Sequence, residues 1–276
     1  MKCAWNCLLT LLPPWLRPAV DRQQEHLQEL RLRAKKVTLV TDGKRLQLPR
    51  GATQEDLQYV VSSACRYSPW RAASMQQGYM ATEGGHRIGL CGEVTLRDGQ
   101  IAGISKLTSL NIRVARDFPG ISRDLCRYEG SVLILGPPGS GKTTLLRDLI
   151  RQRSQRETIS VVDSRGELFP TEADFPSGEQ TDILSNCPKA EGMEMVLRTM
   201  NPDCIAVDEI TASEDCRAMI HAGWCGVSLL ATAHAASVED LKNRPVYAPL
   251  AQCCLFDTAV ILRRDKSWRV ERMGKR

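Results

Sequence analysis

The hydrophobic residues in the second half of the chain fall in short apolar runs, which are separated by longer amphipathic stretches. Runs of about five apolar residues predict buried strands, and the stretches between them have the length and periodicity of helices. Strands that alternate with helices are typical of a mostly parallel sheet. From about residue 126 onward the pattern therefore predicts an α/β fold, with strands near residues 131–135, 158–162, 204–208, 227–232, 258–263 and 268–272.

The first half has shorter elements and frequent turn residues, which predict a smaller α+β domain. Thr53 followed by Asp56 is a capping box, and the dipeptides Asp42-Gly43 and Asp98-Gly99 are hairpin turns. We place the domain boundary between residues 125 and 126, giving domains of residues 1–125 and 126–276. The expected elements are a surface helix over residues 18–33, a hairpin over 36–41 and 44–48, a helix from 53 to 65, and strands over 78–96, 101–104 and 110–115.

The first 16 residues are apolar enough to suggest a signal peptide. However, Pro13 and Pro14 interrupt them, no small-residue cleavage site follows, and the stretch is too short to span a bilayer. We expect a docking segment or a short amphipathic start, and no later stretch approaches the length of a transmembrane helix.

Charge is unevenly divided between the two halves. Residues 1–125 contain 18 Lys and Arg against 11 Asp and Glu, whereas residues 126–276 contain 19 against 21. A basic first half suggests an acidic partner, such as a membrane surface, a nucleic acid or a neighbouring subunit's phosphates. A basic face that simply contacts solvent is the alternative.

The chain has 11 cysteines but no Cys-x-x-Cys pair, so the spacing does not predict a zinc site. The cysteines are scattered through apolar surroundings. We expect most of them to be buried small hydrophobic residues in a protein of the reducing cytoplasm.

The strongest motif follows the first predicted strand of the second half and matches the phosphate-loop pattern G-x-x-x-x-G-K-[ST]. Glycines allow backbone N–H groups to surround a phosphate, and the following helix N-terminus adds positive potential. Lys142 is expected to reach the β- and γ-phosphates, and the Thr143 hydroxyl to hold Mg²⁺. A Rossmann dinucleotide site is disfavoured because the glycines do not follow G-x-G-x-x-G. The expected nucleotide-binding residues are Gly136, Pro137, Pro138, Gly139, Ser140, Gly141, Lys142, Thr143 and Thr144.

Three further strand ends carry polar residues, and parallel strands present these ends at one edge of the sheet. Asp208 and Glu209 close one apolar run as in a Walker B element, so Asp208 is expected to hold Mg²⁺ through water and Glu209 to polarise the attacking water. Glu167 is either a second candidate base or the N-terminal acid of a short helix. His234 is either a structural histidine or a sensor of the γ-phosphate.

These motifs occur in the same order as in the type II and type IV secretion and pilus-motor ATPases, which the second half resembles. Nearly the whole chain resembles the stage III sporulation protein AA family. The residues that carry the two resemblances are 27–33, 77–92, 109–116, 200–209 and 231–235.

The resemblance implies a P-loop NTPase domain of the RecA-like (ASCE) class that hydrolyses ATP with Mg²⁺ as a hexameric ring. It implies a cytoplasmic ATPase, peripheral at the inner face of the mother-cell membrane, that energises a channel between mother cell and forespore through membrane channel proteins of the sporulation complex. In such rings arginines of the N-terminal domain reach a bound nucleotide, and the candidates are Arg87, Arg113 and Arg116. Ordinary surface cations are the alternative for all three.

Two other functions fit parts of the sequence. A nucleic-acid-handling P-loop ATPase would explain the basic first half. However, the chain has no RNP-type aromatic motif and only 5% aromatic residues, so a nucleic-acid partner is not favoured. A nucleotide-dependent structural switch would need no turnover, and the acidic pair Asp208-Glu209 argues against it.

Overall fold

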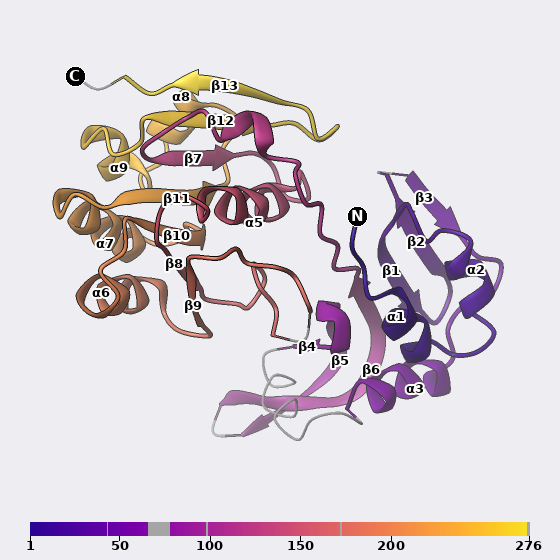
Figure 1. Ribbon diagram of the computed structural model, residues 1–276. Coiled ribbons are helices and arrows are strands. Elements are labelled where there is room, and N and C mark those ends of the chain that lie inside the picture. The colour runs from indigo at the N-terminus through magenta and orange to yellow at the C-terminus, as the bar shows by residue number, and fades with distance from the viewer. Residues whose placement is uncertain (43, 66–77, 98, 172, 275–276) are drawn as a thin grey trace. The chain divides into compact units, whose positions relative to one another are not determined.

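The computed structural model in Figure 1 describes residues 1–42, 44–65, 78–97, 99–171 and 173–274. The chain divides into two compact units, residues 1–117 with 171–174 and residues 118–170 with 175–276. The domain boundary expected between residues 125 and 126 lies near this division and stays a prediction. Each unit encloses a hydrophobic core of its own.

The first unit contains an antiparallel six-stranded sheet in the order β3-β2-β1-β6-β5-β4. Apolar residues of three short helices pack with the apolar residues of the sheet in one core. The elements are α1 (Trp5–Leu11), α2 (Arg17–Asp21), β1 (Leu27–Arg33), β2 (Val37–Thr41), β3 (Lys44–Gln47), α3 (Gln54–Cys65), β4 (Tyr79–Ala81), β5 (Arg87–Arg97) and β6 (Gln100–Arg113).

The N-terminal segment is part of this core. Trp5, Leu8 and Leu12 are buried, and the Trp5 indole donates a 2.8 Å hydrogen bond from Nε1 to Oδ1 of Asp21. The short amphipathic start is therefore confirmed, and the segment packs within the core of its own unit. A docking role for it stays a prediction. Among the described residues, none of the helices combines the length and apolar character needed to cross a bilayer.

The surface helix expected over residues 18–33 is wrong for its second half, which forms strand β1. Leu30 and Leu32 are buried and alternate with polar residues, as in a strand with one covered face. A β-bulge between Leu27 and Glu29 adds one residue, so Leu27 is also buried. The resulting spacing of three between Leu27 and Leu30 imitates the helical repeat.

Other expectations for this unit are confirmed in part. The strand expected over residues 78–96 is divided into β4 and β5 by a 3-10 turn at Glu83–Gly85. Residues of β2 and β3 pair as the expected hairpin, although Gly43 in its turn lies outside the described residues. The capping box is present: the backbone N–H of Thr53 donates to Asp56, and that of Asp56 donates to the Thr53 hydroxyl. Such a cap contributes about 1 kcal/mol. The two strands expected after Asp98, itself outside the described residues, form the single strand β6.

The second unit is built around a seven-stranded sheet in the order β13-β12-β7-β11-β10-β8-β9. All neighbouring strands are parallel except β13, which pairs antiparallel with β12. The elements are β7 (Val132–Leu135), α5 (Lys142–Arg153), β8 (Ile159–Asp163), β9 (Thr181–Ser185), α6 (Lys189–Thr199), β10 (Cys204–Glu209), α7 (Ser213–Trp224), β11 (Ser228–Ala233), α8 (Val238–Lys242), α9 (Ala248–Gln252), β12 (Thr258–Leu262) and β13 (Trp268–Arg272).

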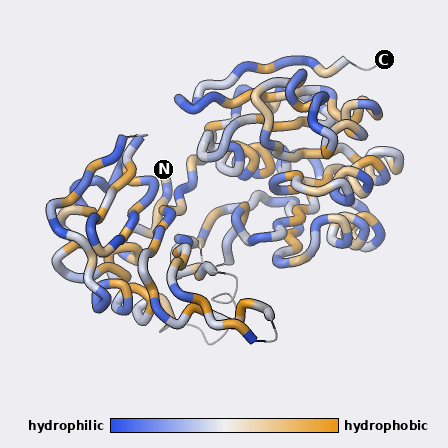
Figure 2. Tube along the Cα trace, turned by 180° about the vertical axis from the view of Figure 1, so that it is seen from behind, coloured by the Kyte–Doolittle hydropathy of each residue, from blue (hydrophilic) through white to orange (hydrophobic). Residues whose placement is uncertain are grey.

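Two cores lie on the two faces of this sheet. Helix α5 packs on one face, where Leu145 and Leu149 meet alternate residues of the strands. Helices α6 and α7 pack on the other face with residues such as Met193 and Met219. The inner strands are correspondingly hydrophobic in Figure 2. A parallel sheet covered on both faces is the α/β fold predicted from the apolar runs.

A buried carboxylate fixes the position of α5. Asp148 accepts hydrogen bonds of 2.8–2.9 Å from the backbone N–H groups of Gly120 and Ser122 and from the Ser122 hydroxyl, and it pairs with Arg151 at 2.7 Å. Burial opposes ionisation, but these hydrogen bonds and the guanidinium hold the pKa of Asp148 below its ordinary value. The helix that follows the phosphate loop is therefore anchored by an ionised residue.

Two further expectations are wrong. The sequence pattern did not predict strand β9. Its side chains are mostly half-buried, and its residues form no apolar run. Most cysteines are not buried: Cys204 and Cys216 are, but Cys91, Cys225 and Cys253 are exposed and the other six are half-buried. Burial raises the pKa of the Cys204 thiol to about 12, which keeps it protonated and unreactive.

Candidate nucleotide-binding site

The phosphate loop joins the end of β7 to the start of α5, as the sequence predicts. Gly139 (φ 75°) and Gly141 (φ 98°) adopt left-handed backbone conformations, and Gly141 is the N-cap of α5. At Gly136 a Cβ atom would lie 2.7 Å from the Ser140 hydroxyl and 2.9 Å from the Leu262 carbonyl oxygen. Glycine is therefore required at these positions for backbone conformation or for close packing. The expected loop residues 136–144 lie together here.

Lys142 is the buried cation of the loop, with a residue exposure of 5%. Its Nζ donates to the carbonyl oxygens of Gly136 (3.0 Å) and Pro137 (3.3 Å) and contacts Nδ1 of His234 at 3.0 Å. Burial lowers the pKa of Lys142, and the charge of Glu209 acts in the opposite direction. The ammonium is thus already held at the loop by neutral acceptors.

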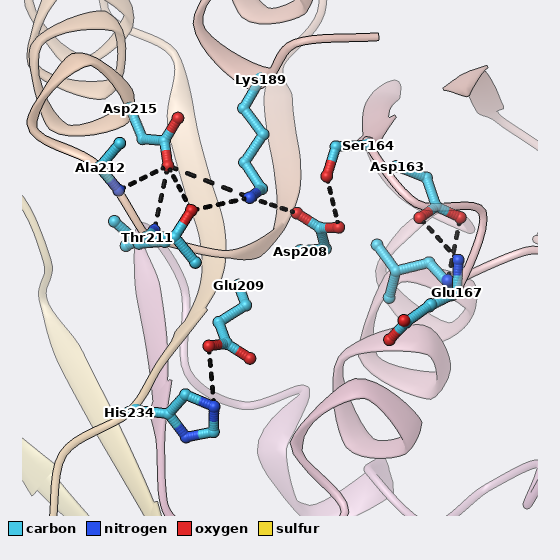
Figure 3. A network of polar contacts seen from close by, with 12 residues as sticks. Asp163, Ser164, Glu167, Lys189, Asp208, Glu209, Thr211, Ala212, Asp215 and His234 are labelled. Carbon is cyan, nitrogen blue, oxygen red and sulfur yellow. Dashed lines mark hydrogen bonds and ion pairs between the residues drawn. The ribbon is translucent and has the colours of Figure 1, made fainter. Parts of the chain in front are cut away.

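His234 connects this lysine to the acidic pair. Its Nε2 lies 2.7 Å from Oε1 of Glu209, and Figure 3 shows this contact. Nδ1 of His234 also lies 3.2 Å from the Gly136 carbonyl oxygen. Because an ammonium can only donate, the pairing with Lys142 uses Nδ1 as an acceptor, and in that tautomer the ring N–H is on Nε2, facing Glu209. The structure therefore brings together Lys142, His234 and Glu209 from three neighbouring strand ends.

Asp208 occupies a β-bulge at the end of β10. Val207 pairs with Ala231 and Glu209 with Thr232, so Asp208 is the extra residue of this strand. A bulge changes the direction of consecutive side chains, which otherwise point to opposite faces. Asp208 is buried and accepts a 2.9 Å hydrogen bond on Oδ2 from the Ser164 hydroxyl.

Three buried aspartates near this edge differ in how their oxygens are satisfied. Asp163 accepts from the backbone N–H groups of Glu167, Leu168 and Phe169, each at 2.9 Å. Asp215 accepts two backbone N–H groups and the Thr211 hydroxyl. Asp208 Oδ1, by contrast, has no hydrogen bond within the described residues, although Lys189 Nζ lies at 3.4 Å. Asp208 is therefore the carboxylate best placed to take a further cation or water.

Asp163 shapes the loop that carries Glu167. Its carboxylate ties down three successive backbone N–H groups, so Glu167 lies in an irregular loop and not at the start of a helix. The helix-start interpretation of Glu167 is wrong. The Glu167 carbonyl oxygen accepts a 2.8 Å hydrogen bond from Arg147. Its role as a second candidate base stays a prediction.

The residues fit a magnesium nucleotide. Within the described residues, the Ser140 hydroxyl is a buried polar atom without a hydrogen bond, as is Asp208 Oδ1. Phosphate oxygens can satisfy the loop donors, and Mg²⁺ in nucleotide sites uses few protein ligands beside phosphates and waters. In the part of the chain that the structure describes, no group of three or more His, Cys, Asp or Glu side chains is arranged to hold a metal ion. Thr143, in the first turn of α5, and Asp208 are the candidate metal ligands.

The three candidate arginines belong to the first unit. Arg87 and Arg113 are cross-strand neighbours on β5 and β6, and the Arg87 guanidinium lies 4.0 Å from the centre of the Tyr79 ring. With Asn111 they line a hollow of about 190 Å³. Arg116 instead donates to the carbonyl oxygen of Leu27 at 3.0 and 3.1 Å. Their proposed contact with nucleotide stays a prediction.

Sequence reasoning missed Lys189 and Ser164. Lys189 lies at the first position of α6, and its ammonium contacts Asp208, Thr211 and Asp215. Ser164 follows Asp163 and binds Asp208. No spacing rule marks a lysine on a distant helix, but the position of Ser164 directly after a predicted strand end was a usable signal.

A glycine phosphate loop between a strand and a helix, together with an acidic strand end two strands away, defines a P-loop NTPase of the RecA-like (ASCE) class. Within that class, the chain belongs to the sporulation stage III protein AA family, whose model matches residues 11–272.

Three comparisons bear on the family and on the fold. Stage III sporulation protein AA of Bacillus subtilis is 35% identical over 95% of this chain and 92% of its own length. Type II secretion system protein E of Klebsiella pneumoniae is 30% identical over 44% of this chain and 24% of that protein. The ATPase DotB of Yersinia pseudotuberculosis has the same fold, with a TM-score of 0.62 and 13% identity over 90% of this chain and 74% of that one.

The buried carboxyl of Asp208 makes stability depend on pH. Burial raises its pKa to about 6 from 3.8, against the influence of Lys189 and Ser164. The folded state then binds the proton more tightly, so this stabilisation is complete below about pH 4 and is lost as the pH rises through about 6.

We expect the free energy of unfolding of the wild type, relative to Asp208→Asn, to fall by up to about 3 kcal/mol between about pH 4 and 7.5. Urea unfolding of both proteins across this range measures it. If the difference in unfolding free energy between the wild type and Asp208→Asn does not vary with pH, the raised pKa of Asp208 is contradicted.

Proposed function

We propose that this protein is a Mg²⁺-dependent ATPase of the secretion-motor type. The observation that carries the proposal is the chain of contacts from Lys142 through His234 to Glu209, at the mouth of a phosphate loop. If His234 had a structural role alone, it would not need to contact both Lys142 and Glu209. The likeness of fold to the ATPase DotB and the homology to type II secretion system protein E support the same reaction.

The residues have separate tasks in this reaction. The loop N–H groups and the N-terminus of α5 bind the phosphates, and Lys142 exchanges its carbonyl and imidazole acceptors for β- and γ-phosphate oxygens. Bound Mg²⁺ would neutralise charge on the phosphates, with Thr143 and Asp208 as its protein ligands. Glu209 orients and polarises the attacking water, and His234 holds the Glu209 carboxylate in position.

His234 makes this arrangement responsive to nucleotide. Nδ1 of His234 loses its donor when Lys142 turns to the phosphates, while Nε2 remains close to Glu209. A water molecule can then donate a hydrogen bond to Nδ1. The position of Glu209 is thereby linked to occupation of the phosphate site, which is the sensing role expected for His234.

We further propose that the protein works as a hexameric ring at the cytoplasmic face of the mother-cell membrane, where hydrolysis energises a channel complex between mother cell and forespore. Membership of the sporulation family supports this role. Channel proteins of that complex are the proposed partners.

One observation favours a second candidate function, a nucleic-acid-handling ATPase. In the first unit Arg31, Arg33, Lys35, Lys36 and Arg45 line a shallow hollow of about 280 Å³. Phosphate contacts of such a surface would make the affinity for DNA or RNA fall steeply with salt. A salt titration of binding therefore separates this candidate from the motor.

The loop assignment predicts the effect of Lys142→Ala. Its ammonium provides charge-assisted hydrogen bonds to the phosphates, so ATP affinity should fall by roughly 10- to 100-fold and hydrolysis should be lost, with the fold intact. Nucleotide titration with circular dichroism measures both. Lys242→Ala removes an exposed lysine of the same unit and serves as the control. Wild-type affinity in folded Lys142→Ala would refute the site.

The role of Glu209 is tested against that of Glu167. Glu209→Gln should keep magnesium nucleotide bound but lose the carboxylate that polarises water, which lowers the rate by roughly 10²- to 10⁴-fold. Glu167→Gln should retain most of the activity. Single-turnover hydrolysis of both variants decides the matter, because an active Glu209→Gln beside an inactive Glu167→Gln places the base in the loop after β8.

The arginines of the first unit should act on a neighbouring subunit's nucleotide. We expect Arg→Ala at one or more of positions 87, 113 and 116 to lower turnover while ATP binding is nearly unchanged, because arginines supplied in trans stabilise charge on the transferred phosphoryl group. Mixing such a variant with Lys142→Ala should restore part of the activity. If all three single variants hydrolyse ATP at the wild-type rate, the proposed action of these arginines on a neighbouring subunit is excluded.

A further inference from the structure

Lys189 is a buried cation beside the candidate metal ligand. Its residue exposure is 8%, and its Nζ lies 3.4 Å from Oδ1 of Asp208, 3.4 Å from the Thr211 hydroxyl and 4.0 Å from Oδ2 of Asp215. Figure 3 shows the ammonium between the two carboxylates. Burying a lysine is costly unless it is paired, so these contacts account for its position.

The place of Lys189 in the chain is electrostatically unfavourable. It is the first residue of α6, directly after Pro188. The positive end of a helix dipole repels a cation there, and acidic residues are the usual choice. Lys189 is unfavourable for the start of a helix but contacts two buried carboxylates. We therefore expect its role to lie at the candidate metal site and not in stabilising α6.

The contacts of Lys189 lie on both sides of Glu209 in the sequence. Asp208 precedes Glu209, and Thr211 begins the turn that Asp215 caps before α7. The backbone between them is held further by a 2.8 Å hydrogen bond from Ile210 N–H to the Thr232 carbonyl oxygen. Lys189 thus joins the bulged strand end to the turn that follows it.

The two oxygens of the Asp208 carboxylate have different partners. Ser164 donates to Oδ2, and Lys189 lies at ion-pair distance from Oδ1 but outside hydrogen-bond geometry. Oδ1 therefore keeps its acceptor capacity. The lysine offsets charge and sets orientation without occupying the oxygen that a metal-bound water would use.

We propose that Lys189 is a positioning residue that holds Asp208 ready for the metal of a bound nucleotide. This inference rests on the proposed function and adds a residue of α6 to the metal site. Outer partners of this kind change metal affinity by roughly 10- to 100-fold when they are removed. Lys189 should therefore affect nucleotide binding through Mg²⁺ and not through the phosphate loop.

The test measures the affinity of the full-length protein for a non-hydrolysable ATP analogue, by calorimetry, with Mg²⁺ and with EDTA. We expect Lys189→Met to reduce the strengthening by Mg²⁺ by roughly tenfold and to leave the affinity in EDTA unchanged. Lys189→Gln keeps a donor for Thr211 without the charge and provides a second variant if the first fails to fold. Lys242→Met removes an exposed charge as the matched control.

A double-mutant cycle shows whether the effect passes through Asp208. In an Asp208→Asn background, Lys189→Met should cause no further loss of Mg²⁺ dependence. Equal losses with and without Mg²⁺, or additive losses in the double variant, would mean a purely structural lysine and overturn the inference. An unchanged Mg²⁺ effect in both folded variants would overturn it as well. Failure of the wild type to bind the analogue would instead refute the proposed function and the inference together.

Discussion

The rest of the site depends on where the charge of Lys142 is held. The loop needs a cation for phosphate, and this cation is a buried side chain. Two loop carbonyl oxygens and Nδ1 of His234 accept hydrogen bonds from the Lys142 ammonium. Burial lowers the pKa of Lys142, and the charge of Glu209 opposes this effect. Since His234 also contacts Glu209, the phosphate-binding group and the candidate base are parts of one network.

Parallel strand order makes this network possible. Strands β7, β11 and β10 are neighbours, so the loop, His234 and the acidic pair end at one edge of the sheet. The bulge at Asp208 then separates the tasks of two consecutive acids. Asp208 lies near Ser164 and Lys189, whereas Glu209 faces His234. In a regular strand consecutive side chains point to opposite faces of the sheet, and the bulge changes the directions of these two.

The sequence predicted the second unit well because strands covered on both faces are continuous apolar runs. Strand β9 was missed because its half-buried residues form no such run. In the first unit the bulge beside Leu27 disrupted the alternation of β1 and produced a helical spacing. Local patterns record which residues are buried, but a bulge changes their period.

The candidate site shows the same limit. Lys142, Asp208, Glu209 and His234 follow apolar runs, so topology alone predicts their proximity. Lys189 comes from the start of a helix, and only the packing of α6 on the sheet brings it to Asp208. Similarly, Asp163 satisfies backbone N–H groups that a sequence pattern does not reveal.

The most direct test of the coupled network is a crystal structure with Mg²⁺ and a non-hydrolysable ATP analogue. We expect Lys142 Nζ to lie on β- and γ-phosphate oxygens and to have left Nδ1 of His234, with Nε2 still beside Glu209. A nucleotide bound away from residues 136–144, or a Lys142 that remains on His234 while phosphate occupies the loop, would contradict this account.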